Sequence, residues 1–172
     1  GCFELLYTEK GIAKTELFKA PVTPAEQARD ELLGALVGLA RAAASEPKTA
    51  DTDEGLNAGL CLAAQPDASE EKLRRMLAIV RTEKQRVAPG CATCAMPCGN
   101  TADYDLTRLW HAPEPILNLK IQMLSAAAAL ARKRPSGDAQ TAVYQVLFTL
   151  AESWDEELLL PVVQKAQKLC AE

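Results

Sequence analysis

The chain has 172 residues, of which 48% are hydrophobic and 24% charged, with a formal net charge of −4. This length predicts a single domain over residues 1–172, large enough to bury a core without disulfides. The acidic balance offers no basic excess to neutralise phosphates, and no apolar run approaches the ~20 residues of a membrane span, so we expect no nucleic-acid or membrane partner. Because no charged and apolar leader opens the sequence, we expect a cytoplasmic protein.

Residues 1–22 are predicted to form an N-terminal arm, in which the stretch 3–19 allows two interpretations. Glu9, Lys10 and Gly11 stand between apolar runs, as the turn of a β-hairpin would. The same stretch is compatible with a helix that is weakened at Gly11. We prefer a helix or an irregular arm and keep the hairpin as the alternative.

The first strong helix is predicted to begin at Thr23. Thr23 is a good N-cap, Pro24 suits the first helical position, and Glu26 completes a capping box. The apolar residues that follow recur at helical spacing as far as Ala43, and Pro47 ends the pattern. These signals together predict an amphipathic helix.

A second helix is expected from an N-cap at Asp51 or Thr52, and it stops before Pro66. Gly55 and Gly59 weaken this helix by about 1 kcal/mol each relative to alanine. Their small size would also let a neighbouring helix approach closely.

The third helix is predicted from a cap at Asp67 or Ser69 to the stop at Pro89-Gly90. Basic residues recur between Lys72 and Arg86 at helical spacing, with glutamates among them. This pattern is typical of a solvated helix face, and we prefer that interpretation to an anion-binding surface.

Three further helices are expected after an irregular segment, over residues 113–134, over 138–152, and from a cap at Ser153 or Asp155. The inward stripe of the first of them is predicted to contain Leu117, Ile121, Leu124, Ala128 and Ala131. Pro161 either kinks the last helix or marks its true first turn.

The fold class that follows is all-α, an up-and-down bundle of five to six helices with one long cysteine-containing loop at residues 89–112. Most of the other connections are short, which favours antiparallel neighbours. Alanine-rich helix faces not needed for the core would allow the chain to form a homo-oligomer.

The cysteine loop contains PGCATCAMPCGN, in which Cys91, Cys94 and Cys98 have the spacing C-x2-C-x3-C. Two intervening residues bring two sulfurs to one side of a tight turn, and Gly90 and Gly99 permit the backbone conformations that such turns need. Clustered thiols in a reducing compartment indicate metal or redox chemistry before structural disulfides. We therefore predict a metal site here.

A tetrahedral site needs a fourth ligand. His111 is the only histidine and lies at the end of the same loop, so it is the first candidate. Cys61 and Cys170 are alternatives, although a lone cysteine is usually a small buried hydrophobic residue. Cys2 is a poorer choice near the terminus, and an open fourth position is also compatible. A Cys91–Cys94 disulfide, or no chemical role for the loop, stays an alternative to metal binding.

Iron–sulfur and zinc sites differ in how their cysteines are distributed. Zinc knuckles usually come in pairs, and the chain has no second C-x2-C. Cluster-binding loops more often gather several cysteines locally and take another from a distance. We therefore expect an iron–sulfur cluster, with zinc as the alternative cofactor.

The segment TDEGLNAGL, from Thr52 to Leu60, is followed by an acidic turn and a basic helix. It resembles a stretch in the helical domain of hybrid cluster proteins, the hydroxylamine reductase family. The resemblance covers a small part of the chain and implies a helical bundle and a cysteine-ligated cluster. That family carries its first cysteine cluster at the N-terminus with another spacing, and has large α/β lobes that this chain lacks. The resemblance therefore implies no reductase activity and no catalytic residue.

Two functional hypotheses result. The first is a cluster-binding helical protein that serves in electron transfer or redox sensing and meets a redox partner protein. The second is a non-catalytic interaction or scaffold bundle, with a structural zinc ion or no metal. The sequence does not decide whether the chain is an enzyme.

Overall fold

The computed structural model describes residues 3–9, 12–18, 23–45, 50–87, 113–133 and 137–172. The elements are β1 (Phe3–Glu9), β2 (Ile12–Phe18), α1 (Pro24–Ser45), α2 (Ala50–Ala63), α3 (Glu70–Val87), α4 (Glu114–Arg132), α5 (Asp138–Glu152) and α6 (Glu156–Ala171). The helices pack as a bundle, so the predicted all-α bundle is confirmed, and six helices lie in the described ranges.

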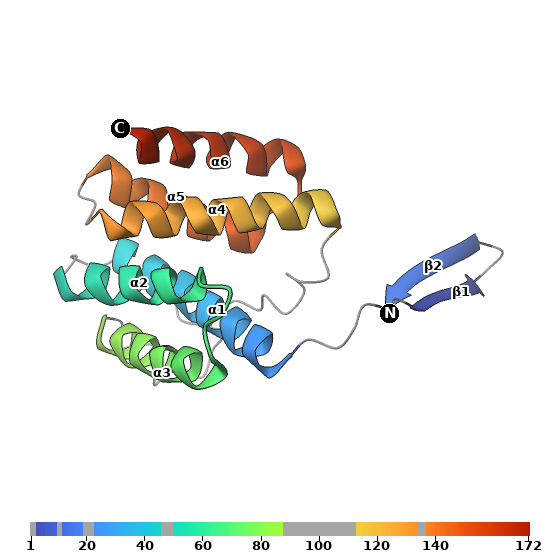
Figure 1. Cartoon of the computed structure of the whole chain (residues 1–172), viewed down its shortest axis with the longest axis horizontal. Helices are drawn as coiled ribbons and strands as arrows, with labels where there is room; N and C mark the ends of the chain where they lie inside the picture. The colour runs from blue at the N-terminus through green and yellow to red at the C-terminus, as the bar shows by residue number, and fades with distance from the viewer. Residues whose placement is uncertain (1–2, 10–11, 19–22, 46–49, 88–112, 134–136) are drawn as a thin grey trace.

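The six helices form two groups of three (Figure 1). Helices α1, α2 and α3 contact one another in the first group, and α4, α5 and α6 do so in the second. Consecutive helices within each group run in opposite directions, as short connections require (Figure 1). The groups meet where α2 packs on α4 and α1 packs on α5. The segment between α3 and α4, which holds the predicted cysteine loop, therefore joins one group to the other.

One hydrophobic core extends through both groups. Each helix contributes side chains from one face, and the largest fully buried hydrophobic ones are leucines and a methionine. They are Leu32, Leu33, Leu36, Leu39, Leu56, Leu60, Leu73, Met123, Leu130 and Leu147. The alanines of α4, including Ala126, Ala127 and Ala128, are also buried, so small side chains let several helices approach α4.

The capping signals of the sequence are mostly confirmed. The backbone N–H of Thr23 donates to Glu26 Oε2 at 2.7 Å, and the N–H of Glu26 donates to Thr23 Oγ1 at 3.2 Å, which is a capping box. Helix α2 instead begins at Ala50, so the expected cap at Asp51 or Thr52 is wrong. An acidic residue is favoured in the first turn as well as at the cap, so Asp51 fits both positions.

The start of α6 decides which residue is its N-cap and where Pro161 lies. The Asp155 carboxylate accepts a hydrogen bond from the N–H of Glu157 at 2.9 Å, so Asp155 is the cap. Pro161 lies inside the helix, not in its first turn. Its missing N–H would have bonded the carbonyl of Glu157, which belongs to an exposed residue near the helix start, so the loss is borne where water is available.

Strands β1 and β2 show that the preferred helical interpretation of the arm is wrong. They form an antiparallel hairpin in which Phe3 pairs with Phe18 and Glu9 pairs with Ile12. Each strand has seven residues and is rich in the aromatic, β-branched and leucine residues that suit a pleated sheet. The hairpin alternative is therefore confirmed, although Glu9, which it assigned to the turn, is the last residue of β1.

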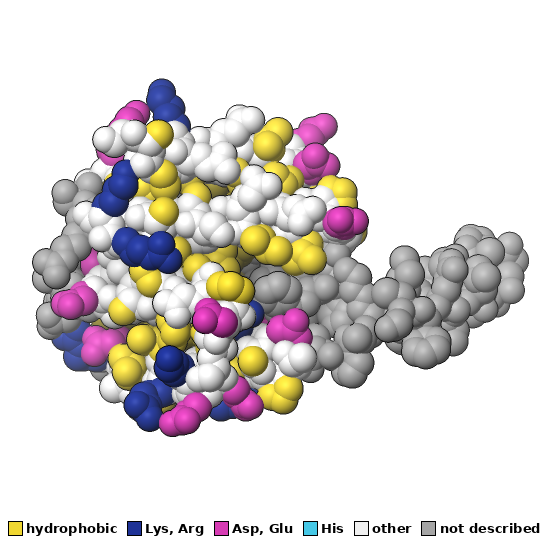
Figure 2. Space-filling model, in the orientation of Figure 1, with side chains coloured by type: hydrophobic (Ala, Val, Ile, Leu, Met, Phe, Trp, Pro, Cys, Tyr) yellow, Lys and Arg dark blue, Asp and Glu magenta, His cyan; other side chains and the backbone are white. Residues whose placement is uncertain are grey.

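The outer surface carries both signs of charge. On the face in Figure 2, basic and acidic side chains alternate with hydrophobic ones, and neither sign covers a large area. On α3, Arg74 bonds Glu70 at 2.7 Å and Arg75 bonds Glu71 at 3.1 Å, so this part of the face predicted between Lys72 and Arg86 is solvated. Lys84 departs from the prediction, because it is buried. Among the helices described, none combines the length and apolar character needed to cross a membrane.

Close packing at Gly59 leads to a testable stability difference. A Cβ at Gly59 would lie 2.7 Å from Leu36 Cδ2 and 3.4 Å from Val80 Cγ2, and both of those residues are fully buried. We expect Gly59→Ala to lower the free energy of unfolding by about 1–3 kcal/mol, because the core must shift to admit the methyl group. Urea unfolding followed by circular dichroism measures the change.

Gly55 provides the matched control on the same helix. A Cβ there would meet only Glu83 Cγ, at an ordinary 3.8 Å. Gly55→Ala should therefore be neutral or stabilising by up to about 1 kcal/mol, through helix propensity alone. Equal effects of the two substitutions would contradict the close approach of α1 and α2.

Candidate functional site

The predicted metal ligands Cys91, Cys94, Cys98 and His111 lie outside the described residues. What the structure shows is how the chain enters and leaves their segment. The chain leaves the first helix group at Val87 and enters the second at Glu114. In sequence, the predicted ligands therefore belong to the longest connection between consecutive helices, the one that links the two helix groups.

Cys61 and Cys170, the other candidates for a fourth ligand, are both placed. Each is half-buried and packs against the hydrophobic core. The Cys61 thiol donates to the carbonyl of Ala128 at 3.6 Å, and the Cys170 thiol donates to that of Ala126 at 3.4 Å. Residues two apart on a helix point about 200° apart, so the two thiols approach α4 from different sides. The structure thus does not bring these cysteines together.

The two thiols also lie far along α4 from Glu114, where the chain enters α4 after the predicted ligand segment. Ala126 and Ala128 lie 12 and 14 residues after Glu114, the first residue of α4. At 1.5 Å per residue this is about 18–21 Å along the helix axis. The core contacts of Cys61 and Cys170 and their hydrogen bonds to α4 carbonyls favour a packing role over a ligand role. Across the described ranges, no group of three or more His, Cys, Asp or Glu side chains could hold a metal ion.

A buried lysine on α4 is a site that the sequence interpretation missed. Lys120 is 1% exposed, and its Nζ donates to the carbonyl of Leu150 at 2.8 Å. The same nitrogen lies 3.6 Å from the centroid of the Trp154 ring. Burial lowers the pKa of Lys120 to about 8. The ammonium satisfies a carbonyl in the last turn of α5 and stacks on an indole, so it ties the α5–α6 corner to α4.

The same region corrects the predicted inward stripe of α4. The predicted stripe contains Ile121, but the side chain of Ile121 is 42% exposed, whereas Lys120 is buried. The inward face is therefore rotated towards Lys120. A signal was present, since Lys120 lies three residues after Leu117 and four before Leu124, but a lysine is rarely assigned to a core on pattern alone.

A second polar site joins the two helix groups between α2 and α5. The Tyr144 hydroxyl donates to Asp53 Oδ1 at 2.5 Å, and Gln140 Nε2 donates to the same oxygen at 3.2 Å. Asn57 Nδ2 reaches Gln140 Oε1 at 3.5 Å. Burial, and then the hydrogen bond to Asp53, raise the pKa of Tyr144 well above its usual value. The hydroxyl therefore stays protonated and acts as a donor between the groups.

Removing the Tyr144 hydroxyl tests this connection. Tyr144→Phe is expected to lower the free energy of unfolding by about 1.5–3 kcal/mol, because a hydrogen bond to a carboxylate is lost. In a double-mutant cycle with Asp53→Ala, the two losses should not add, since both remove the same bond. Urea unfolding of the four proteins measures the coupling. Additive losses would show that the bond contributes nothing.

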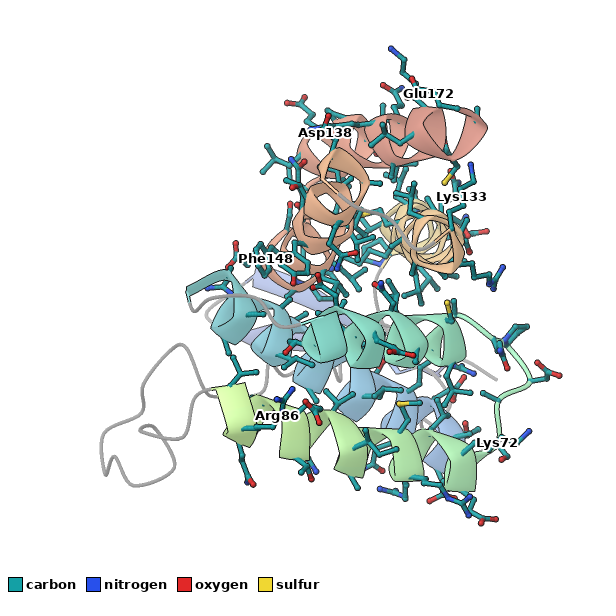
Figure 3. The ribbon with its side chains drawn as sticks, turned by 90° about the vertical axis from the view of Figure 1, so that its left-hand side faces the viewer. Lys72, Arg86, Lys133, Asp138, Phe148 and Glu172 are labelled. Carbon is teal, nitrogen blue, oxygen red and sulfur yellow. The ribbon has the colours of Figure 1, made fainter. Side chains whose placement is uncertain are left out.

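A third connection between the groups involves Arg41 of α1. Its guanidinium forms an ion pair with Glu152 and lies 5.4 Å from the centroid of the Phe148 ring. Figure 3 labels Phe148 where α5 approaches the first helix group. Together with Tyr144 and Asp53, this contact orients α5 on the first group. These polar contacts account for packing and do not form a nucleophile with a base.

The outer side of α4 and α6 has an open depression of about 350 Å³. Uncharged residues line it, including Ile121, Ser125, Ala129, Gln167 and Cys170. It holds no pair of acidic or basic groups that could exchange a proton. Figure 3 shows Lys133 beside this end of α6, where its ammonium donates to the carbonyl of Cys170.

Comparison with known proteins adds no further assignment, since no protein-family model, curated protein or solved structure matches this chain. The resemblance of Thr52–Leu60 to hybrid cluster proteins stays a prediction.

Proposed function

We propose that the chain binds an iron–sulfur cluster through Cys91, Cys94 and Cys98 and serves in electron transfer or redox sensing. The observation that carries the proposal is the spacing C-x2-C-x3-C within one connection of an otherwise helical chain. Thiolates are the preferred ligands of such clusters, and a local group of cysteines with glycines beside it suits the tight turns that cluster loops make. His111 is the proposed fourth ligand.

The packing of Cys61 and Cys170, the two cysteines that the structure describes, supports this choice of ligands. To ligate a metal, Cys61 or Cys170 would have to lose its proton and its hydrogen bond to an α4 carbonyl. Each would also leave a half-buried position in the hydrophobic core. Zinc held by three cysteines and His111 is the alternative occupant.

The position of the connection suits a redox role. A cluster there would be bound by the part of the chain that follows α3 and precedes α4, and so links the two helix groups in sequence. A change in cluster charge would act on the segment that joins them, which suits a sensor, and a redox partner protein would meet this segment in electron transfer. The cytoplasmic location expected from the sequence would provide the reducing conditions that keep the thiols available.

Anaerobic purification with metal analysis tests the proposal. The visible absorption spectrum and the iron, zinc and acid-labile sulfide contents should be measured on one sample of the full chain. Iron and sulfide with a broad band at roughly 400 nm would support an iron–sulfur cluster. Zinc without colour would make the site a structural clamp. A colourless and metal-free protein that folds normally would favour the scaffold function and overturn the proposal.

A further inference from the structure

The hairpin of β1 and β2 is a sheet of two strands only. Its seven paired positions run from Phe3 opposite Phe18 to Glu9 opposite Ile12. Within the ranges that the structure describes, no third strand pairs with either one. Two strands alone are marginally stable in water, and each outer edge presents backbone donors and acceptors that can pair with another strand. The hairpin is therefore suited to pairing with a strand from outside it.

We propose that β2 pairs antiparallel with β2 of a second copy of this chain, so that two hairpins form one four-stranded sheet about a twofold axis at Thr15. This inference is independent of the proposed cluster. A twofold interface uses the same residues from both copies, so the strand must be complementary to itself.

The order of residues in β2 meets this condition. Pairing about Thr15 sets Lys14 opposite Glu16 of the second copy, and the symmetry repeats this opposite-charge pair. It also sets Ile12 opposite Phe18, which joins a β-branched residue to an aromatic one. Both kinds of cross-strand pair are stabilising, as are paired threonines such as those at the axis.

The alternative registers are less complementary. An axis at Lys14 or at Glu16 would set that charged residue opposite its own copy, and like charges in that position are destabilising. Self-pairing of β1 about Leu6 would set Phe3 opposite Glu9 and provide no opposite-charge pair. The charge order therefore selects β2, and within β2 it selects Thr15 as the centre.

Charge reversal tests the proposal on the full chain by sedimentation equilibrium. The wild type is expected to be a dimer. Lys14→Glu and Glu16→Lys should each raise the dimer dissociation constant by at least about tenfold, because each sets like charges opposite one another twice. The double variant K14E/E16K restores opposite charges in reversed order and should restore the dimer.

The double variant also separates pairing from folding, since it contains both substitutions. A monomeric wild type would overturn the proposal. A dimer that both single variants leave unchanged would overturn it too, because the interface would then lie elsewhere. Failure of the double variant to restore the dimer would show that these positions do not face each other.

Discussion

The free energy of unfolding is expected to rise by about 1–2 kcal/mol between about pH 7.5 and pH 9.5 through Lys120 alone. The pKa of Lys120 is lowered to about 8 in the folded chain, against an ordinary value of 10.5. Between these values the unfolded chain binds more protons than the folded chain. Stability therefore increases with pH across this window, because the folded state holds the neutral amine more easily than the ammonium.

The surroundings of Lys120 explain why its charge is costly. The amine is 1% exposed, and the partners recorded for it are the carbonyl of Leu150 and the ring of Trp154. These groups favour an ammonium by less than water does, so burial lowers the pKa. The window ends at pH 9.5 because Tyr144 acts in the opposite direction. Because the folded pKa of Tyr144 is raised, the folded chain keeps the hydroxyl proton above pH 10, near the unfolded pKa, whereas the unfolded chain loses it. Stability is therefore lost as the pH rises further.

Urea unfolding at a series of pH values measures this dependence as a difference between proteins. Lys120→Met keeps a side chain of similar length without the charge, so the rise assigned to Lys120 should disappear. Lys165→Met is the matched control, because Lys165 is exposed on α6 and reaches only Gln145 Oε1 at 3.4 Å. An unchanged slope in the Lys120 variant would contradict the account of this buried amine.

Replacing Cys91, Cys94 and Cys98 together by serine is expected to abolish iron and sulfide binding. Serine keeps the size of the side chain but removes the thiolate that a cluster needs. The helical circular dichroism signal should be retained, because the core of the bundle consists of residues from α1 to α6. Iron and sulfide analysis after anaerobic purification measures the loss.

The matched control replaces Cys61 and Cys170 by serine and should keep the iron and sulfide of the wild type. Both thiols donate to α4 carbonyls, and a serine hydroxyl can donate in the same way. Loss of the cluster in this control would show that a helix cysteine is the missing ligand. Retention of iron and sulfide in the triple variant would contradict the proposed site.

Local signals predicted much of the helical part of the fold. The capping box of Thr23 and Glu26 placed the start of α1, and the limits expected for the fifth helix agree with Asp138–Glu152. These features depend on residues within a few positions of one another. The hairpin is the less favoured alternative in the sequence because Gly11 suits both a turn and a weak helix. A stretch this short also does not distinguish the helical from the strand periodicity of hydrophobic residues.

Contacts between distant residues could not be predicted in the same way. Tyr144 and Asp53 are separated by 91 residues, and their hydrogen bond exists only because the two helix groups pack together, with α2 on α4 and α1 on α5. Lys120 is buried because a carbonyl and an indole from a different helix corner meet it. Such sites depend on the crossing of helices, for which neither hydrophobic periodicity nor capping carries information.

Reversible reduction of the bound cluster is the most direct test of the central claim. The anaerobically purified chain should be titrated with dithionite and then with ferricyanide while its visible spectrum is recorded. The account predicts that the band at roughly 400 nm weakens on reduction and returns on oxidation, with iron and sulfide contents unchanged. A chain that holds only zinc, holds no metal, or shows no such reversible change would contradict a role in electron transfer or redox sensing.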